Sequence, residues 1–141
     1  LFPVCKELGV GFVAFSPLAN GVLSECYNTE SKFDAQTDYR AAMPQYQKDS
    51  FEKNKCLFEM IEQLAMEKHA TPAQVSLAWM MSKKPWVVPI PGTRCLYRLK
   101  ENIGAADISF SQDEVVAIDK ALSSMEISDV FSGSRIVDKA Q

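Results

Sequence analysis

Apolar positions gather in two short runs that predict strands, and polar and helical stretches surround them. Residues 10–15, VGFVAF, are almost continuously apolar, which is typical of a parallel strand buried on both faces. Residues 86–90, WVVPI, form the second run, and this strand should be short because Pro89 lacks the N–H that a sheet ladder uses. The opening LFPVCKELG is typical of the end of a helix that Gly9 closes.

Between the two strands, one long segment shows no period and another shows a helical one. Residues 17–50 are predicted to be a long loop, and loops of this length are uncommon unless they are functional. Residues 51–68 predict a helix that ends at His69 and Ala70, because apolar side chains recur on one face at helical spacing: Leu57, Ile61, Leu64 and Ala65.

Two further helices carry start signals of the capping-box type. Thr71 is the predicted N-cap of the first, Pro72 occupies its first turn, and Gln74 completes the box. The VSLAWMM that follows is apolar nearly all round, so this helix should pack on two sides. Ser111 and Glu114 form the second box, ahead of a helix with one apolar face: Val115, Ile118 and Leu122.

The remaining elements complete an α/β order of helix, strand, helices, strand and helices. A helix is predicted over residues 95–103 and ended by Gly104, and a surface tail is predicted from Met125 onward. This order favours parallel strands. Two strands alone cannot cover the apolar helix after Thr71, so we expect the chain to be a fragment of a longer protein.

Composition narrows the function classes. The 141 residues are 47% hydrophobic and 23% charged, as in a globular domain rather than a disordered or membrane protein. The net charge of -3 argues against general nucleic-acid binding, and no apolar run approaches the roughly 18 residues of a membrane span. We therefore expect neither nucleic acid nor membrane as a partner.

The cysteine and histidine content argues against a metal site. Cys5, Cys26, Cys56 and Cys95 are too far apart to form a CxxC pair, and His69 is the single histidine. We expect no bound metal, and four reduced, mostly buried thiols in a cytoplasmic protein.

Both predicted strands end in residues that suit a phosphate. Ser16 to Gly21 follow the first strand, and Gly92, Thr93 and Arg94 follow the second, with Arg98 one turn into the next helix. Glycine lets a ligand approach the backbone closely, and a helix N-terminus attracts anions. Arginine binds phosphate through bidentate hydrogen bonds. Taken alone, Gly92 to Arg94 are more often a plain capping turn, because these residue types are common before helices, and it is the two strand ends together that favour a phosphate.

Three separated motifs resemble the aldo-keto reductase superfamily, in the order GVGFVAFSPLANGVLS, ATPAQVSLAWMMSKKPWVVPIPGTR and RLKENIGAADISFSQDEVVAID. The likeness is to bacterial-type NADP-dependent enzymes and covers residues 1–122, with 123–141 as a C-terminal tail. It implies an α/β fold, the C-terminal part of a TIM (β/α)8 barrel. The chain would hold strands and helices 7–8 plus a C-terminal extra helix.

The resemblance also implies an NADP(H) site. Phe15 matches the aromatic on which the nicotinamide stacks, where the family more often has Tyr. The other implied contacts surround the phosphates and the adenine: Ser16 and Leu18 at the pyrophosphate, Asn20 and Gly21 in the loop over it, Gly92, Thr93, Arg94 and Arg98 around the 2′-phosphate, and Glu101 and Asn102 at the adenine end. The paired arginines favour NADP(H) over NAD(H), because a 2′-phosphate needs a cationic partner.

The family's catalytic Asp, Tyr, Lys and His come from the first half of the barrel, and none of those positions exists here. His69 matches a position where the family commonly has Gly, at a helix end. The resemblance therefore implies an oxidoreductase that reduces aldehydes or ketones to alcohols, to which this chain contributes cofactor binding and no catalytic residue. We expect the chain alone to be inactive.

Two expectations about partners follow. The chain should need the missing N-terminal barrel half, NADP(H) and a small carbonyl substrate, and without that half its apolar strands should self-associate. The alternative function is a non-catalytic, cofactor-sensing binding subunit, as in the potassium-channel beta subunits of the same superfamily, with the 19–50 segment as the partner surface.

Overall fold

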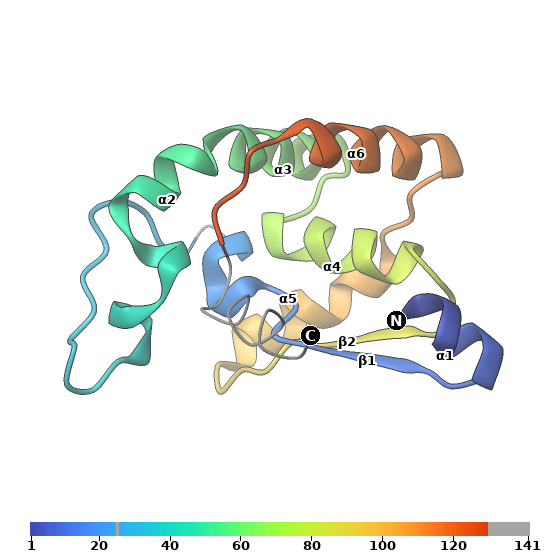
Figure 1. Ribbon diagram of the computed structural model, residues 1–141, viewed down its shortest axis with the longest axis horizontal. Helices are drawn as coiled ribbons and strands as arrows, with labels where there is room; N and C mark the ends of the chain where they lie inside the picture. Colours follow the sequence, from blue (N-terminus) through green and yellow to red (C-terminus); the bar gives the residue numbers. More distant parts are fainter. Residues whose placement is uncertain (25, 130–141) are drawn as a thin grey trace, which may run out of the picture.

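A computed structural model describes residues 1–24 and 26–129 as helices layered on a two-stranded parallel sheet (Figure 1). The elements in chain order are α1 (Phe2–Leu8), β1 (Phe12–Phe15), the 3-10 helices η1 (Ala19–Ser24), η2 (Tyr39–Ala42) and η3 (Pro44–Tyr46), α2 (Lys48–Lys53), α3 (Lys55–Glu67), α4 (Pro72–Ser82), β2 (Val87–Ile90), α5 (Leu96–Gly104), the 3-10 helix η4 (Ala105–Asp107) and α6 (Gln112–Ser124).

The sheet confirms both predicted strands and their parallel direction. β1 and β2 pair from Phe12 opposite Val87 to Phe15 opposite Ile90. β1 begins at Phe12 and not at residue 10, because the Val10 N–H bonds back to the carbonyl of Cys5 in the turn that closes α1. Both strands are therefore four residues long.

The expectation that the first strand is buried on both faces is wrong. Successive strand residues point to opposite faces, so the register places Val13 beside Val88 and Phe15 beside Ile90 on one face. These four side chains are 50–74% exposed, because no described element covers that face. We call them the open sheet face. The other face, which includes buried Val87, lies against α4.

Helix α4 lies at the centre of the molecule, between the sheet and α3 (Figure 1). Its capping box has formed, with the Thr71 hydroxyl and the Gln74 side chain each accepting the other's backbone N–H. Val75 and Leu77 are each 1% exposed, and α4 contacts α3, α5, β2, η1 and η4. The prediction of a helix packed on two sides is confirmed.

The 51–68 prediction is corrected by a break at Asn54. Two helices, α2 and α3, replace the one expected, and α2 begins at Lys48. Asn54 is 2% exposed and its side chain binds Ser128, which holds the junction in place. Ser128 therefore belongs to the packed structure and not to a surface tail, while tail residues 130–141 lie outside the described residues.

The long 17–50 segment is also more ordered than a loop, because η1, η2 and η3 occupy much of it. Its side chains form a core in which Val22 and Tyr46 are buried together with Phe51 of α2. The ring of Tyr27 packs edge-to-face on Tyr46, with centroids 5.5 Å apart. This core holds the segment beside the end of β1.

Helix ends follow the predicted signals with one exception. α3 ends in a Schellman turn, in which the N–H groups of His69 and Ala70 bond to the carbonyls of Met66 and Ala65. The Ser111 capping box of α6 is confirmed. α5 ends at Gly104, within one residue of the prediction, but Gly104 is not a left-handed cap: it keeps right-handed helical angles, and the chain runs on into η4.

All four cysteines are free, but the expectation that most are buried is wrong. Cys5 is buried, whereas Cys26, Cys56 and Cys95 are exposed. Cys56 is an exposed residue of α3, Cys26 lines the cleft described below, and Cys95 is the N-cap of α5. Within residues 1–24 and 26–129, no helix is long and apolar enough to cross a membrane.

Candidate functional site

The segments that follow β1 and β2 enclose one cleft of about 500 Å³. The parallel register brings Phe15 beside Ile90, so both strands deliver their polar ends to the same edge of the sheet. Most of the residues predicted for a cofactor line this cleft: Ser16, Leu18, Asn20, Gly21, Gly92, Thr93, Arg98, Glu101 and Asn102. The structure therefore brings together two groups that lie far apart in the sequence.

The wall formed by residues 16–21 has an unusual backbone. Ser16, Ala19 and Asn20 adopt φ values of 51°, 49° and 59°, which non-glycine residues seldom do. The Ser16 hydroxyl donates to Asn20 Oδ1 at 2.9 Å. The Tyr46 hydroxyl donates to the Asn20 carbonyl at 2.7 Å, and burial raises the pKa of that tyrosine. Such strain is concentrated at functional sites, where the surroundings hold it in place.

Gly21 is required at its position in this wall. Its φ is 108°, and a Cβ there would lie 2.8 Å from the ring of Tyr27. Its carbonyl accepts a hydrogen bond from the Ser24 hydroxyl at 2.7 Å. The turn therefore presents backbone, without a side chain, to the cleft.

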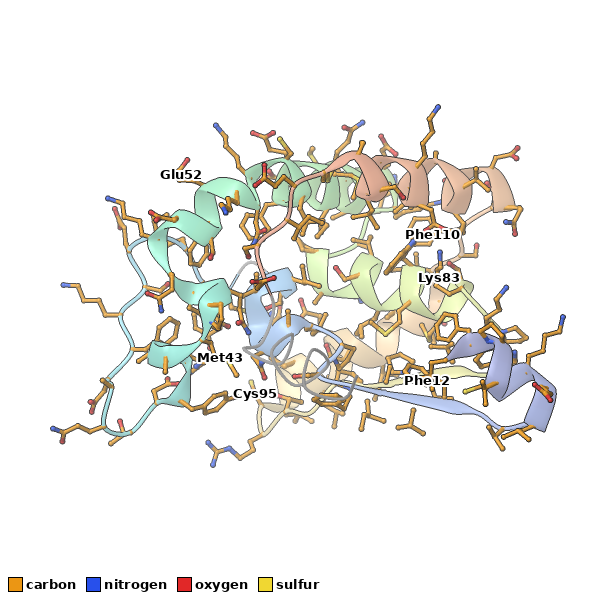
Figure 2. All side chains as sticks on the ribbon, in the orientation of Figure 1. Phe12, Met43, Glu52, Lys83, Cys95 and Phe110 are labelled. Atoms are coloured by element: carbon orange, nitrogen blue, oxygen red, sulfur yellow. The ribbon has the colours of Figure 1, made fainter. Side chains whose placement is uncertain are left out.

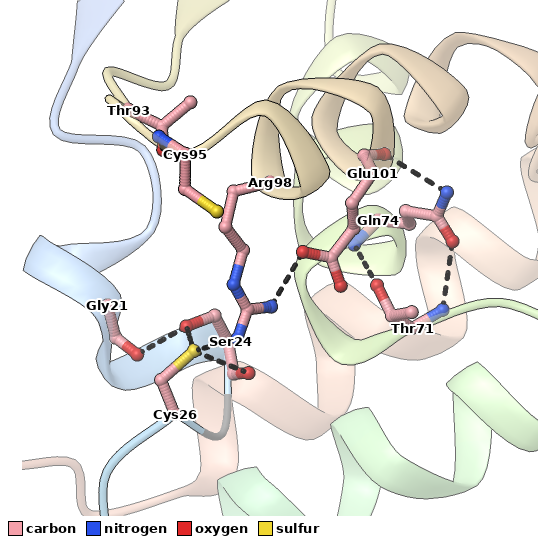
Figure 3. Close-up of polar contacts among 9 residues, drawn as sticks. All are labelled: Gly21, Ser24, Cys26, Thr71, Gln74, Thr93, Cys95, Arg98 and Glu101. Atoms are coloured by element: carbon pink, nitrogen blue, oxygen red, sulfur yellow. Dashed lines mark hydrogen bonds and ion pairs between the residues drawn. The ribbon is translucent and has the colours of Figure 1, made fainter.

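Helix α5 forms the opposite wall and reaches across the cleft through Arg98 (Figure 3). Its guanidinium donates to Glu101 Oε2 at 2.7 Å and to the Sγ of Cys26 at 2.7 Å. The hydrogen bond to Glu101 raises the pKa of Arg98. A permanently cationic, fork-shaped donor is thus fixed between the two walls.

Thr93 belongs to the turn that opens α5. Its Oγ1 accepts the backbone N–H of Cys95 at 3.1 Å, which is a local turn role of the kind that the sequence also allowed. Because the hydroxyl accepts this bond, its own proton remains a donor for another group. The capping and anion-binding interpretations are therefore compatible at this residue.

Two predicted residues lie elsewhere. Phe15 is 74% exposed on the open sheet face, because strand alternation turns it to the same side as Val13. Arg94 is exposed and is absent from the lining of the cleft. The structure does not bring either side chain into the cleft with the other nine.

The cleft also includes residues that were not predicted for it. Ala73, Ile90 and Pro91 line it from α4 and the end of β2, and five more come from the 17–50 segment: Ser24, Cys26, Tyr27, Tyr39 and Arg40. Arg40 donates from Nε to Asp38 Oδ1 at 2.8 Å, and this contact raises its pKa. Its guanidinium also lies over the ring of Tyr27, 4.8 Å from the centroid. Two features of the sequence could have pointed to these residues: the length of the 17–50 segment and the consecutive Asp38, Tyr39 and Arg40.

The chemistry of this arrangement is anion binding. The cleft combines an arginine, a threonine hydroxyl, free backbone at Gly92 and the N-terminal turn of α5, whose N–H groups favour negative charge. Among the described residues, no group of three or more His, Cys, Asp or Glu side chains could hold a metal ion. The cleft is therefore suited to a phosphate-bearing organic ligand.

Comparison with known proteins gives consistent matches. Residues 1–123 match the model of the Aldo/keto reductase family. The chain is 36% identical over 127 residues to Aldo-keto reductase str7 of Strobilurus tenacellus, and this alignment covers 90% of the chain and 38% of that protein. It is 38% identical over 138 residues to Probable aldo-keto reductase 1 of Glycine max (94% and 37%). It is 36% identical over 123 residues to Aldo-keto reductase yakc [NADP(+)] of Schizosaccharomyces pombe (87% and 36%).

Solved structures give the same match in three dimensions. The thermostable aldo-keto reductase Tm1743 aligns with a TM-score of 0.57 at 28% identity, over 86% of this chain and 33% of that structure. The glycerol dehydrogenase AKR11B4 from Gluconobacter oxydans aligns with a TM-score of 0.75 over 94% and 40%, and its 22% identity supports the fold alone. These neighbours are TIM barrels, and a helix-rich chain with a small sheet is consistent with part of one. The chain spans 36–38% of the length of the curated relatives.

Proposed function

The chain belongs to the aldo/keto reductase family, and from that membership we propose that it supplies the nucleotide-binding part of an NADP(H)-dependent oxidoreductase. The proposed reaction of the whole protein is reduction of aldehydes or ketones to alcohols. The observation that carries the proposal is the single cleft in which the end of β1 and the start of α5 meet. Its lining suits the phosphates and the adenosine of a dinucleotide.

Within this proposal, each wall has a distinct task. Thr93 and Arg98 bind the 2′-phosphate, while the strained turn from Ser16 to Gly21 lies against the pyrophosphate. The bound cofactor supplies the hydride, and the residues of this chain hold it in place. Phe15 ends β1 immediately before Ser16, so a nicotinamide that leaves the cleft along this wall reaches the exposed ring.

The preference for NADP(H) over NAD(H) rests on two supports. A 2′-phosphate needs a cationic partner, and Arg98 is a fixed one inside the cleft, whereas Arg94 is exposed outside its lining and four positions away in the sequence. The Schizosaccharomyces pombe relative carries NADP(+) in its name. Glu101 also lines the cleft, and its carboxylate is paired with the guanidinium of Arg98.

We further propose that the chain corresponds to strands and helices 7–8 of the barrel. Catalytic groups would then come from the part of the barrel outside these residues, and this chain alone would be inactive. The open sheet face supports the assignment, because the interior of a barrel is filled by side chains from all its strands. Further strands would cover Val13, Phe15, Val88 and Ile90.

The test is the affinity of the purified protein for NADPH and NADH, measured by titration calorimetry on wild type, Arg98→Ala and Arg94→Ala. Arg98→Ala removes a charge-assisted contact worth about 1.5–3 kcal/mol, so NADPH binding should weaken roughly tenfold or more while NADH binding changes little. Arg94→Ala should also weaken NADPH binding more than NADH binding. Lys100→Ala is the matched control, since Lys100 is an exposed cation on α5 outside the cleft. Equal losses for both cofactors would refute the 2′-phosphate assignment.

A further inference from the structure

Gln74 joins two elements that meet at the cleft (Figure 3). Its Oε1 accepts the backbone N–H of Thr71 at 3.0 Å and so completes the capping box of α4. Its Nε2 points the other way and donates to the backbone carbonyl of Glu101 at 3.0 Å. One side chain therefore caps α4 and fixes the middle of α5.

Glu101 extends this connection to the cleft. Its side chain is 6% exposed, and its carboxylate accepts from Arg98 at 2.7 Å. The orientation of the Arg98 guanidinium therefore depends on where Glu101 stands. A continuous set of contacts leads from the start of α4, through Gln74 and Glu101, to the cationic group in the cleft.

Gly104 leaves the space that Gln74 occupies. It lies one helical turn after Glu101, and a Cβ at this position would be 2.6 Å from Gln74 Nε2. Glycine is a poor helix former, and here it stays within α5 at right-handed angles. Its absent side chain is what allows the amide to reach the Glu101 carbonyl.

We propose that Gln74 is a positioning residue of the nucleotide site, which fixes the turn of α5 that carries Glu101 so that Arg98 faces the 2′-phosphate. This inference rests on the proposed function. Glutamine and glutamate both complete a capping box, but only glutamine adds an N–H donor toward α5. The amide is thus the part of the side chain that matters to the site.

The first test compares Gln74→Glu and Gln74→Ala with wild type for binding of adenosine 2′,5′-bisphosphate and of AMP. Gln74→Glu keeps the cap and loses the donor, so the affinity for the bisphosphate should fall about three- to tenfold, as it should in Gln74→Ala. In an Arg98→Ala background the substitution should have no further effect. Ser111→Ala is the control, because it removes the matching cap of α6 and should lower Tm without changing affinity.

The second test separates positioning from stability. Gly104→Ala would push the Gln74 amide off the Glu101 carbonyl while it improves helix propensity. We expect bisphosphate binding to weaken about three- to tenfold with Tm unchanged or raised. A merely structural role of Gln74 would not give this combination.

The outcomes distinguish this inference from the proposed function. If Arg98→Ala weakens binding but Gln74→Glu and Gly104→Ala bind as wild type does, the positioning role is wrong and the proposed function stands. If wild type binds the bisphosphate no better than AMP, the proposed function is contradicted and the positioning role falls with it.

Discussion

Asn54 and Ser128 lie 74 positions apart in the sequence and exchange two hydrogen bonds. Asn54 Nδ2 donates to Ser128 Oγ at 2.8 Å, and the Ser128 backbone N–H donates to Asn54 Oδ1 at 2.9 Å. This pair fixes the junction of α2 and α3 against the segment after α6. Figure 2 shows the side chains of these helices on the ribbon. The 17–50 segment, which forms one wall of the cleft, runs into α2 and so leads directly to this junction.

Replacing the two partners should have unequal effects. Asn54→Ala removes both bonds and leaves a backbone N–H without its acceptor, so the free energy of unfolding should fall by about 1–3 kcal/mol. Ser128→Ala keeps the backbone bond, and we expect a loss of about 0.5–1.5 kcal/mol. Urea unfolding followed by tryptophan fluorescence measures both. Equal losses would mean that the Ser128 N–H bond contributes nothing.

The Schellman turn after α3 places a non-glycine residue in the left-handed region, since His69 has a φ of 52°. His69→Gly should relieve this and stabilise the protein by about 0.5–1 kcal/mol, after allowance for the greater freedom of the unfolded chain. Met66→Gly, on an exposed position within α3, is the control and should destabilise by about 1 kcal/mol. A destabilised His69→Gly variant would show that the imidazole has a role beyond the turn.

Glu114 predicts a specific pH dependence. Its hydrogen bond from Lys68, at 2.6 Å, and that from the Ser111 backbone lower its pKa below the ordinary value of 4.5. Stability from this carboxylate is therefore present above that value and is lost as the pH falls through the lowered pKa. Glu114→Gln keeps a capping oxygen without the charge. The Tm gap between wild type and this variant should exist at neutral pH and close as the pH falls below 4.5 and through the lowered pKa of Glu114; a gap that is constant with pH would contradict the assignment.

The open sheet face predicts association of the 141-residue chain when it is produced alone. We expect light scattering after size-exclusion chromatography to give a mass above 15.7 kDa, because exposed strand edges and apolar faces pair with other chains. Val88→Lys should shift the protein toward monomer, whereas Val116→Lys, at an exposed position on α6, should not. A monodisperse wild-type monomer would contradict this prediction.

Features that depend on neighbours in the sequence could be predicted. The capping boxes at Thr71 and Ser111 each involve residues three apart, and both form as expected. The two strands and the meeting of Ser16 to Gly21 with Gly92 to Arg98 also followed from local patterns, because parallel strands deliver their carboxyl ends to one edge.

Features set by distant contacts could not be predicted. The break at Asn54 depends on Ser128, and the contribution of Cys26 to the cleft depends on Arg98. Gly104 was expected only as the end of its helix, and the space that it leaves for the Gln74 amide depends on how α4 packs against α5. The exposure of Phe15 reflects the absence of a covering layer in the described residues, which an apolar run does not reveal.

A crystal structure of the protein with adenosine 2′,5′-bisphosphate would show whether the cleft between the two strand ends binds the 2′-phosphorylated end of a dinucleotide. We expect the 2′-phosphate to accept hydrogen bonds from the Arg98 guanidinium and the Thr93 hydroxyl, beside the first turn of α5. A bisphosphate bound elsewhere, with the Arg98 contacts to Glu101 and Cys26 unchanged, would contradict this expectation.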